Sequence, residues 1–262
     1  MLFEIERDGE TILLFGGSRP TTTAWSSPAV EALVARCDEF WNEIPAMGPE
    51  VRGLVATYGV DPARPLDSWL SADDVNRLNA ACAACGVEPS AIAALRPWLA
   101  AQVVRTATDG KLGLMHEHSA EAVLTRRAID AGIPTKSEFA TPEDVFAAFG
   151  SMPPEAEVQY MRFSLYEIES GTERVVRHAE ALARGDMSPI EEETAMMRRE
   201  WPTFHERLVL DRNRAWLPRI EAMLGARTRA FVLVGTAHLV GDEGLLNLLR
   251  IARYSVRQLI DG

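Results

Sequence analysis

A histidine follows directly after an apolar, strand-like run near the C-terminus. Residues 230–234 are almost wholly apolar, which predicts a strand buried on both faces, and they lead into Gly235-Thr236-Ala237-His238. A neutral imidazole can ligate a divalent metal or act as a general base near pH 7. His238 is therefore the first candidate for a metal ligand or a catalytic base. The alternative is a loop histidine that only bonds to the backbone.

A carboxylate stands in a second predicted strand, Phe40 to Ile44, which contains Glu43. An unpaired carboxylate is costly to bury, so Glu43 needs a partner. That partner could be a metal ion, Arg19, or an arginine of the segment Arg212-Asn213-Arg214. A structural ion pair and a role in a reactive site both fit this residue.

A glycine-rich loop, Gly16-Gly17-Ser18-Arg19, follows the strand-like run Thr11 to Phe15. The backbone N–H groups of such a loop, with Arg19, could bind an anionic substrate group. Alternatively, Arg19 neutralises Glu43. Ser18 would act as a nucleophile only with a base nearby, and no GxSxG motif surrounds it.

The densest group of metal-ligand residue types is His116-Glu117-His118. In an extended segment, His116 and His118 would share one face and could supply further metal ligands. The alternative is a solvated loop before the next helix. His178 and His205 lie in helical, charge-rich stretches, which predict surface positions.

Strands at both ends of the sequence must position these residues. Leu2 to Glu6 and Thr11 to Phe15 flank Asp8-Gly9, which predicts a β-hairpin, and Tyr254 to Ile260 predicts a last strand. Both glycine loops follow strand-like runs. Sites in open α/β sheets gather at the carboxyl ends of strands, so the two loops are expected at one sheet edge.

Helical spacing of apolar residues dominates the middle, roughly residues 70–225. Breaks are expected near Gly185 and Pro202. A further helix is expected to begin at Gly241-Asp242-Glu243 and to run to about Ile251, with acids in its first turn. The other predicted elements are helices at 27–37, 71–85, 90–107 (interrupted by Pro97), 119–131, 141–149, 154–183 and 189–224, and a strand at 133–136. We expect a single domain, residues 1–262, of α/β class, in which a central mixed sheet with an N-terminal β-hairpin carries a large helical middle section.

Composition limits the classes of partner. The chain has 262 residues, is 47% hydrophobic and 25% charged, and has a formal net charge of -11. This acidity argues against a nucleic-acid partner and against adsorption to anionic membranes. No apolar run is long enough to span a bilayer, and the acidic N-terminus does not resemble a signal peptide, so we expect a cytoplasmic protein. The three cysteines predict no disulfide framework, and Cys82 and Cys85 are interpreted as core residues.

Five blocks, in order along the chain, resemble the TraB/GumN family, which is similar to the TIKI metalloproteases. The C-terminal block, 231–241, looks like the family's GxxH signature. The others resemble its opening hairpin (2–16), its strand ending in a glutamate (38–44), its "kPW" helix (95–100) and its "RN" helix (211–216).

This resemblance implies an α/β architecture like that of TIKI, erythromycin-esterase-like and ChaN-like proteins, with two GxxH loops and a glutamate facing one cleft. In TIKI members these groups are tied to metal-dependent peptide cleavage. Here Arg19 stands where the family's first GxxH has its histidine, and an arginine cannot ligate a metal. Only His238 and Glu43 remain as implied ligands, fewer than a metal site needs.

Two functions follow as hypotheses. The first is a TraB/GumN-like hydrolase, or a repurposed relative, that acts on a small molecule or peptide. His238, Glu43 and Arg19 would be its catalytic residues, and Mn²⁺, Co²⁺ or Zn²⁺ is a candidate metal. Substrate would be held by six residues: Gly16, Gly17, Ser18, Arg212, Asn213 and Arg214. The second is a catalytically degenerate member that binds an anion or small molecule. A homodimer is a possible assembly.

Overall fold

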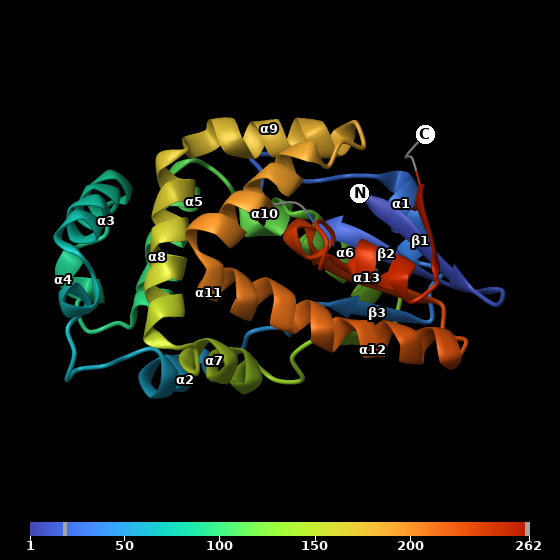
Figure 1. Ribbon diagram of the computed structural model, residues 1–262, viewed down its shortest axis with the longest axis horizontal. Coiled ribbons are helices and arrows are strands. Elements are labelled where there is room, and N and C mark those ends of the chain that lie inside the picture. The colour runs from blue at the N-terminus through green and yellow to red at the C-terminus, as the bar shows by residue number, and fades with distance from the viewer. Residues whose placement is uncertain (18–19, 260–262) are drawn as a thin grey trace.

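The computed structural model describes residues 1–17 and 20–259. A mixed sheet lies at one end of the molecule, with the strand order β4-β3-β5-β2-β1-β6 (Figure 1). Its strands are β1 (Leu2–Arg7), β2 (Glu10–Gly17), β3 (Glu39–Asn42), β4 (Thr135–Ser137), β5 (Ala230–Gly235) and β6 (Ser255–Leu259). β4, β3, β5 and β2 run parallel, and β1 pairs antiparallel with β2 and β6. The predicted α/β fold with a mixed sheet is confirmed.

The N-terminal hairpin forms as the sequence predicts. Asp8 and Gly9 both have positive φ, 55° and 83°, which is the conformation of a type I′ turn. This turn matches the twist of the flanking strands and sets the register in which Leu2 pairs with Phe15. β2 is thereby placed next to β5, in the middle of the sheet.

Helices cover both faces of the sheet. α12 (Asp211–Gly225) and α13 (Leu245–Ile251) pack on the face turned to the viewer in Figure 1, and α1 (Pro28–Val34) and α6 (Ala120–Asp130) pack on the other. β5 explains why both faces need cover, since its side chains alternate between the two cores and nearly all are buried. The predicted burial of this strand on both faces is confirmed.

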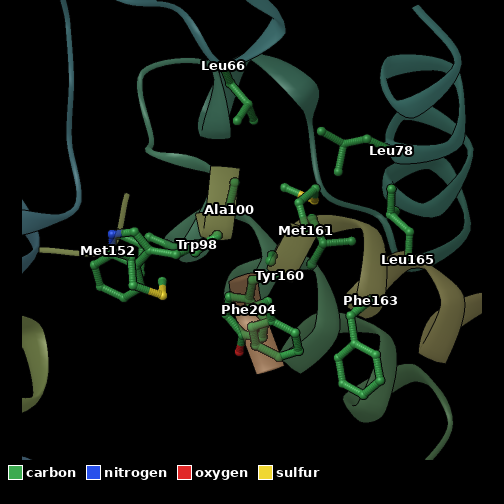
Figure 2. Close-up of a cluster of buried hydrophobic side chains, with 14 of the residues drawn as sticks. Leu66, Leu78, Trp98, Ala100, Met152, Tyr160, Met161, Phe163, Leu165 and Phe204 are labelled. Carbon is green, nitrogen blue, oxygen red and sulfur yellow. The ribbon is translucent and has the colours of Figure 1, made fainter. Parts of the chain in front are cut away.

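The helical middle section has a hydrophobic core of its own. Leu78, Trp98, Tyr160, Met161 and Leu165 come from three helices and lie together in this core (Figure 2). Cys82 and Cys85 are buried here as free thiols, as predicted. The section comprises α2 (Val51–Tyr58), α3 (Ala72–Cys85), α4 (Pro89–Ile92), α5 (Pro97–Lys111), α7 (Pro142–Gly150), α8 (Pro154–Glu169), α9 (Gly171–Ala183), α10 (Ser188–Glu200) and α11 (Pro202–His205), with the 3₁₀ turns η1 (Leu66–Trp69) and η2 (His116–His118).

One continuous helical rod joins the two cores. α11 passes through a π-helical turn, η3 (Glu206–Leu210), directly into α12. Phe204 and Leu210 belong to the helical core, whereas Trp216 and Ile220 belong to the core on the sheet. The rod therefore fixes the helical section to the edge of the sheet where the strands end.

Several predicted boundaries are wrong. α13 begins at Leu245 rather than Gly241, because Gly241 has a positive φ of 84° and residues 241–244 form turns. β3 ends at Asn42, so Glu43 lies just beyond the strand. Pro97 does not interrupt a helix; it starts α5, a position where its missing N–H costs nothing.

The remaining breaks have local causes. The predicted breaks near Gly185 and Pro202 are confirmed, but the stretch 154–183 also divides where Gly171 adopts a positive φ of 59°. β4 occupies Thr135–Ser137, slightly later than the predicted strand at 133–136, and α2 has no counterpart in the sequence analysis. Within the described residues, no helix combines the length and apolarity needed to cross a membrane.

Candidate functional site

The two glycine loops lie side by side at the carboxyl edge of the sheet. β2 and β5 are parallel, with Gly16 opposite Val234 and Gly17 opposite Gly235. A side chain at Gly16 would meet Leu239 at 2.7 Å, so this glycine permits the loop after β5 to pack against β2. Ser18 and Arg19, which follow this glycine pair, lie outside the described residues.

His238 is buried at the end of a 3₁₀ turn, η4 (Thr236–His238), and hydrogen-bonded on one ring nitrogen. Its Nδ1 lies 2.7 Å from Oδ1 of Asn213, and Nδ2 of Asn213 donates to the carbonyl of Glu243 at 2.8 Å. The second bond fixes which way the amide faces, so its oxygen must accept from Nδ1–H. Nε2 is therefore the ring nitrogen that can exchange a proton.

Glu43 faces that second nitrogen. Its Oε1 lies 3.0 Å from Nε2 of His238 and 3.0 Å from Nη2 of Arg212. Burial, the largest influence, opposes ionisation of this carboxyl, but the Arg212 guanidinium and then His238 outweigh it and hold its pKa well below the usual range. Of the partners considered for Glu43, the structure places Arg212 beside it.

A second carboxylate, Glu138, completes the contacts of Arg212. It follows β4 at the same sheet edge, accepts from Nε of Arg212 at 3.0 Å and from Nη2 at 2.5 Å, and accepts from Nε1 of Trp216 at 2.9 Å. Sequence reasoning missed Glu138. The available signal was its position two residues beyond the strand predicted at 133–136.

Glu121 is a third carboxyl group near the cluster and was also missed. It is half-buried in the first turn of α6, whose Ser119 side chain caps the helix. Burial, followed by the charge of Glu43, raises the pKa of Glu121 to about 7, and Arg212 acts in the opposite direction. Glu121 can therefore hold or release a proton near neutral pH.

Three predicted residues do not join this cluster. His116 is exposed, and His118 lies 3.2 Å, through Nδ1, from the carbonyl of Thr21 in the loop after β2. Arg214 is largely exposed and contacts Glu206, Asp211 and Glu243, all outside the cluster. Its predicted place beside substrate thus has no support from its surroundings.

His205, predicted at the surface, is instead 4% exposed. Burial is the largest cause that lowers its pKa, followed by the nearby Arg198. It lines a cavity of about 540 Å³ between α10, α13 and the loop after His238. The prediction was wrong because the charged residues around His205 belong to other helix faces, and α10 covers this one.

The metal site implied by the family resemblance does not fit these side chains. Within the described ranges, no group of three or more histidine, cysteine, aspartate or glutamate side chains is arranged to hold a metal ion. The Glu43 oxygen that faces His238 is also in contact with the permanent cation of Arg212. A divalent ion there would need more ligands and would be opposed by that charge.

The model described as the TraB/PrgY/gumN family matches residues 1–258. No curated protein and no solved structure matches the chain.

Proposed function

Because this chain belongs to the TraB/PrgY/gumN family, we propose that it is a hydrolase that cleaves an amide or ester bond of a small molecule or peptide with His238 as its general base. The observation that carries the proposal is the placement of His238 between Asn213 and Glu43, at 2.7 and 3.0 Å. General-base hydrolysis needs an oriented imidazole and a charge that stabilises its protonated form; Asn213 orients the ring through Nδ1, and Glu43 supplies the charge beside Nε2.

The reaction follows from Nε2 of His238, the ring nitrogen that faces Glu43. Nε2 takes a proton from water as the water oxygen attacks the substrate carbonyl carbon. The ionised Glu43, 3.0 Å away, stabilises the imidazolium that forms. The imidazolium then returns the proton to the leaving nitrogen or oxygen as its bond to carbon breaks. The products are a carboxylic acid and an amine or alcohol.

Arg212 has a supporting role in this scheme. Its guanidinium favours the ionised form of Glu43, and it also pairs with Glu138 at the same sheet edge. No step uses a metal, since the donor set does not fit one.

The test is hydrolysis of a panel of p-nitrophenyl esters and amino-acid anilides by the purified chain. We expect His238→Gln and Glu43→Gln to lower kcat/KM by about a hundredfold or more, the usual range for general-base loss. His116→Gln is the matched control, because His116 is exposed and outside the cluster. Thermal unfolding of each variant separates lost chemistry from lost folding. Equal rates in His238→Gln and wild type would refute the assignment.

Elemental analysis after loading with Mn²⁺, Co²⁺ or Zn²⁺ tests the metal-free scheme. We expect that the chain binds no stoichiometric metal ion whose binding depends on His238. A stoichiometric ion lost in His238→Gln would contradict it.

A second candidate is stoichiometric binding of an anion without turnover. The observation that favours it is the 3.0 Å contact between Glu43 and Nε2 of His238, which occupies the ring nitrogen that hydrolysis would use. Inactivity towards the whole panel, together with tight binding of an organic anion, would support this alternative.

A further inference from the structure

A hollow of about 380 Å³ borders the cluster on the side of Arg212 and Glu138. Its volume lies within the range of small-molecule sites. One wall is a face of the rod, where Leu208, Arg212, Ala215 and Arg219 recur at helical spacing. The opposite wall comes from Phe139 and from the segment where α7 gives way to α8.

Three arginines line this hollow, and one of them has no ion-pair partner among the described residues. Arg212 pairs with Glu43 and Glu138, and Arg207 pairs with Asp211 at 3.0 Å. Arg219 has no carboxylate within ion-pair distance among the residues that the structure describes. Its Nη1 is buried and has no hydrogen-bond partner there.

A buried guanidinium nitrogen without an acceptor is unfavourable, because it has lost water and gained nothing in return. The nearest aromatic contact does not replace an acceptor, since the guanidinium carbon lies 5.8 Å from the centre of the Trp216 ring. In a chain of net charge -11, a half-buried arginine left without a carboxylate points to an anion supplied from outside.

The other lining residues indicate what kind of group would carry the negative charge. Phe139, Phe149, Met152 and Leu208 offer apolar and aromatic surface beside the charged end. A planar guanidinium binds a carboxylate through two parallel hydrogen bonds. Arg207 and Arg212 already have carboxylate partners. The hollow is therefore suited to a ligand with a single negative charge.

We propose that this hollow is a binding site for a small aromatic carboxylate, whose charged end pairs with Arg219 and whose ring lies against Phe139 and Phe149. The site goes beyond the proposed hydrolysis, because its occupancy does not depend on turnover. The larger cavity beside His205 differs from it, since charged residues of both signs, such as Glu191 and Arg198, line it.

The test is calorimetric titration of the whole chain with 3-phenylpropionate and with its uncharged analogue 3-phenylpropionamide. We expect the acid to bind at one site and the amide to bind about tenfold more weakly or not at all. Arg219→Gln should weaken the acid by about tenfold while leaving the amide unchanged, the effect of one charge-assisted contact at a half-buried position.

Arg250→Gln is the matched control. Arg250 also lacks a carboxylate partner among the described residues, but it lines the larger cavity. We expect it to bind the acid like wild type. Equal affinity for acid and amide, no binding of the acid at millimolar concentration, or loss in Arg250→Gln instead of a folded Arg219→Gln would overturn the proposal. Ester hydrolysis is measured separately, so failure of one proposal does not decide the other.

Discussion

Two acceptors flank the His238 ring, and they differ in charge. Glu43 can stabilise an imidazolium, whereas the neutral amide of Asn213 only fixes the ring and its Nδ1 proton. A neutral acceptor at Nδ1 places no second negative charge beside the ring. Asn213 is therefore a positioning residue, and the neutrality of its amide is the property to test.

Asn213→Asp is expected to move the acidic limb of the kcat/KM profile to higher pH by about one unit. The added carboxylate favours the imidazolium, so the base form appears only at higher pH. Asn247→Asp is the control, because its Nδ2 donates to a backbone carbonyl in the same way, to Asp242 at 2.7 Å. A limb that stays in place in Asn213→Asp, or moves in the control, would contradict the role.

The raised pKa of Glu121 makes a prediction about stability. The native state keeps this carboxyl protonated up to about pH 7, while the unfolded chain releases the proton near 4.5. Its contribution to stability is thus full below about pH 4.5 and is lost as pH rises through 7. Glu121→Gln should exceed wild type in free energy of unfolding by about 2 kcal/mol at pH 8 and by little at pH 4.5.

Urea unfolding at several pH values measures this difference for Glu121. Glu117→Gln, an exposed neighbour, should follow wild type throughout. A constant difference across pH would show that Glu121 ionises normally.

The sequence anticipated the residues that local pattern marks and missed those that only packing reveals. His238 was found because a glycine loop follows an apolar strand, and Arg212 was among the partners foreseen for Glu43. Glu138 lies just beyond a predicted strand, but its partners, such as Trp216, come from residues distant in the sequence, and Glu121 has no local signal. Arg219 carries no local signal either.

At the scale of elements, Arg212 links the start of α12 to two carboxylates at the sheet edge. Arg212 reaches the carboxylates that follow β3 and β4, at 3.0 and 2.5 Å, and all three side chains are at most 18% exposed. Removing it would leave two poorly solvated carboxylates without a cation.

Arg212→Gln should therefore lower the free energy of unfolding by about 3 kcal/mol at pH 7. Pairing lowers the pKa of Glu43, so this stabilisation is present above the unfolded value near 4.5 and is lost as pH falls below it. The deficit should thus shrink in acid. Arg214→Gln, two residues along, should be nearly neutral because Arg214 is largely exposed. Equal losses in the two variants at pH 7 would refute the difference.

Element boundaries were predictable where a cap or a turn residue marks them. α3 begins after Ser71, which forms a capping box with Asp74, as the start signal predicts. The start of α13 was misplaced because acids after a glycine also suit a turn. The turn before α13 requires Gly244, since a side chain there would meet the Val240 carbonyl oxygen at 2.3 Å. Such a close approach cannot be read from sequence.

At the scale of the whole molecule, the rod formed by α11, η3 and α12 makes the two cores interdependent. Its first part supplies Phe204, stacked on Tyr160 of the helical core with ring centres 5.0 Å apart. Its last part buries Trp216 and Ile220 against the sheet. Opening either core would expose part of this helix, so we expect the two cores to unfold together as one domain.

One substitution in each core tests this interdependence. Leu165→Ala opens a cavity in the helical core, and Ile220→Ala opens one on the sheet; both side chains are at most 1% exposed. Each should lower the free energy of unfolding by about 3 kcal/mol. If the rod couples the cores, circular dichroism and tryptophan fluorescence should report one coincident urea transition in every variant. If Leu165→Ala shifts only part of a biphasic transition that Ile220→Ala leaves in place, the cores unfold separately, and the chain consists of two domains joined by a helix.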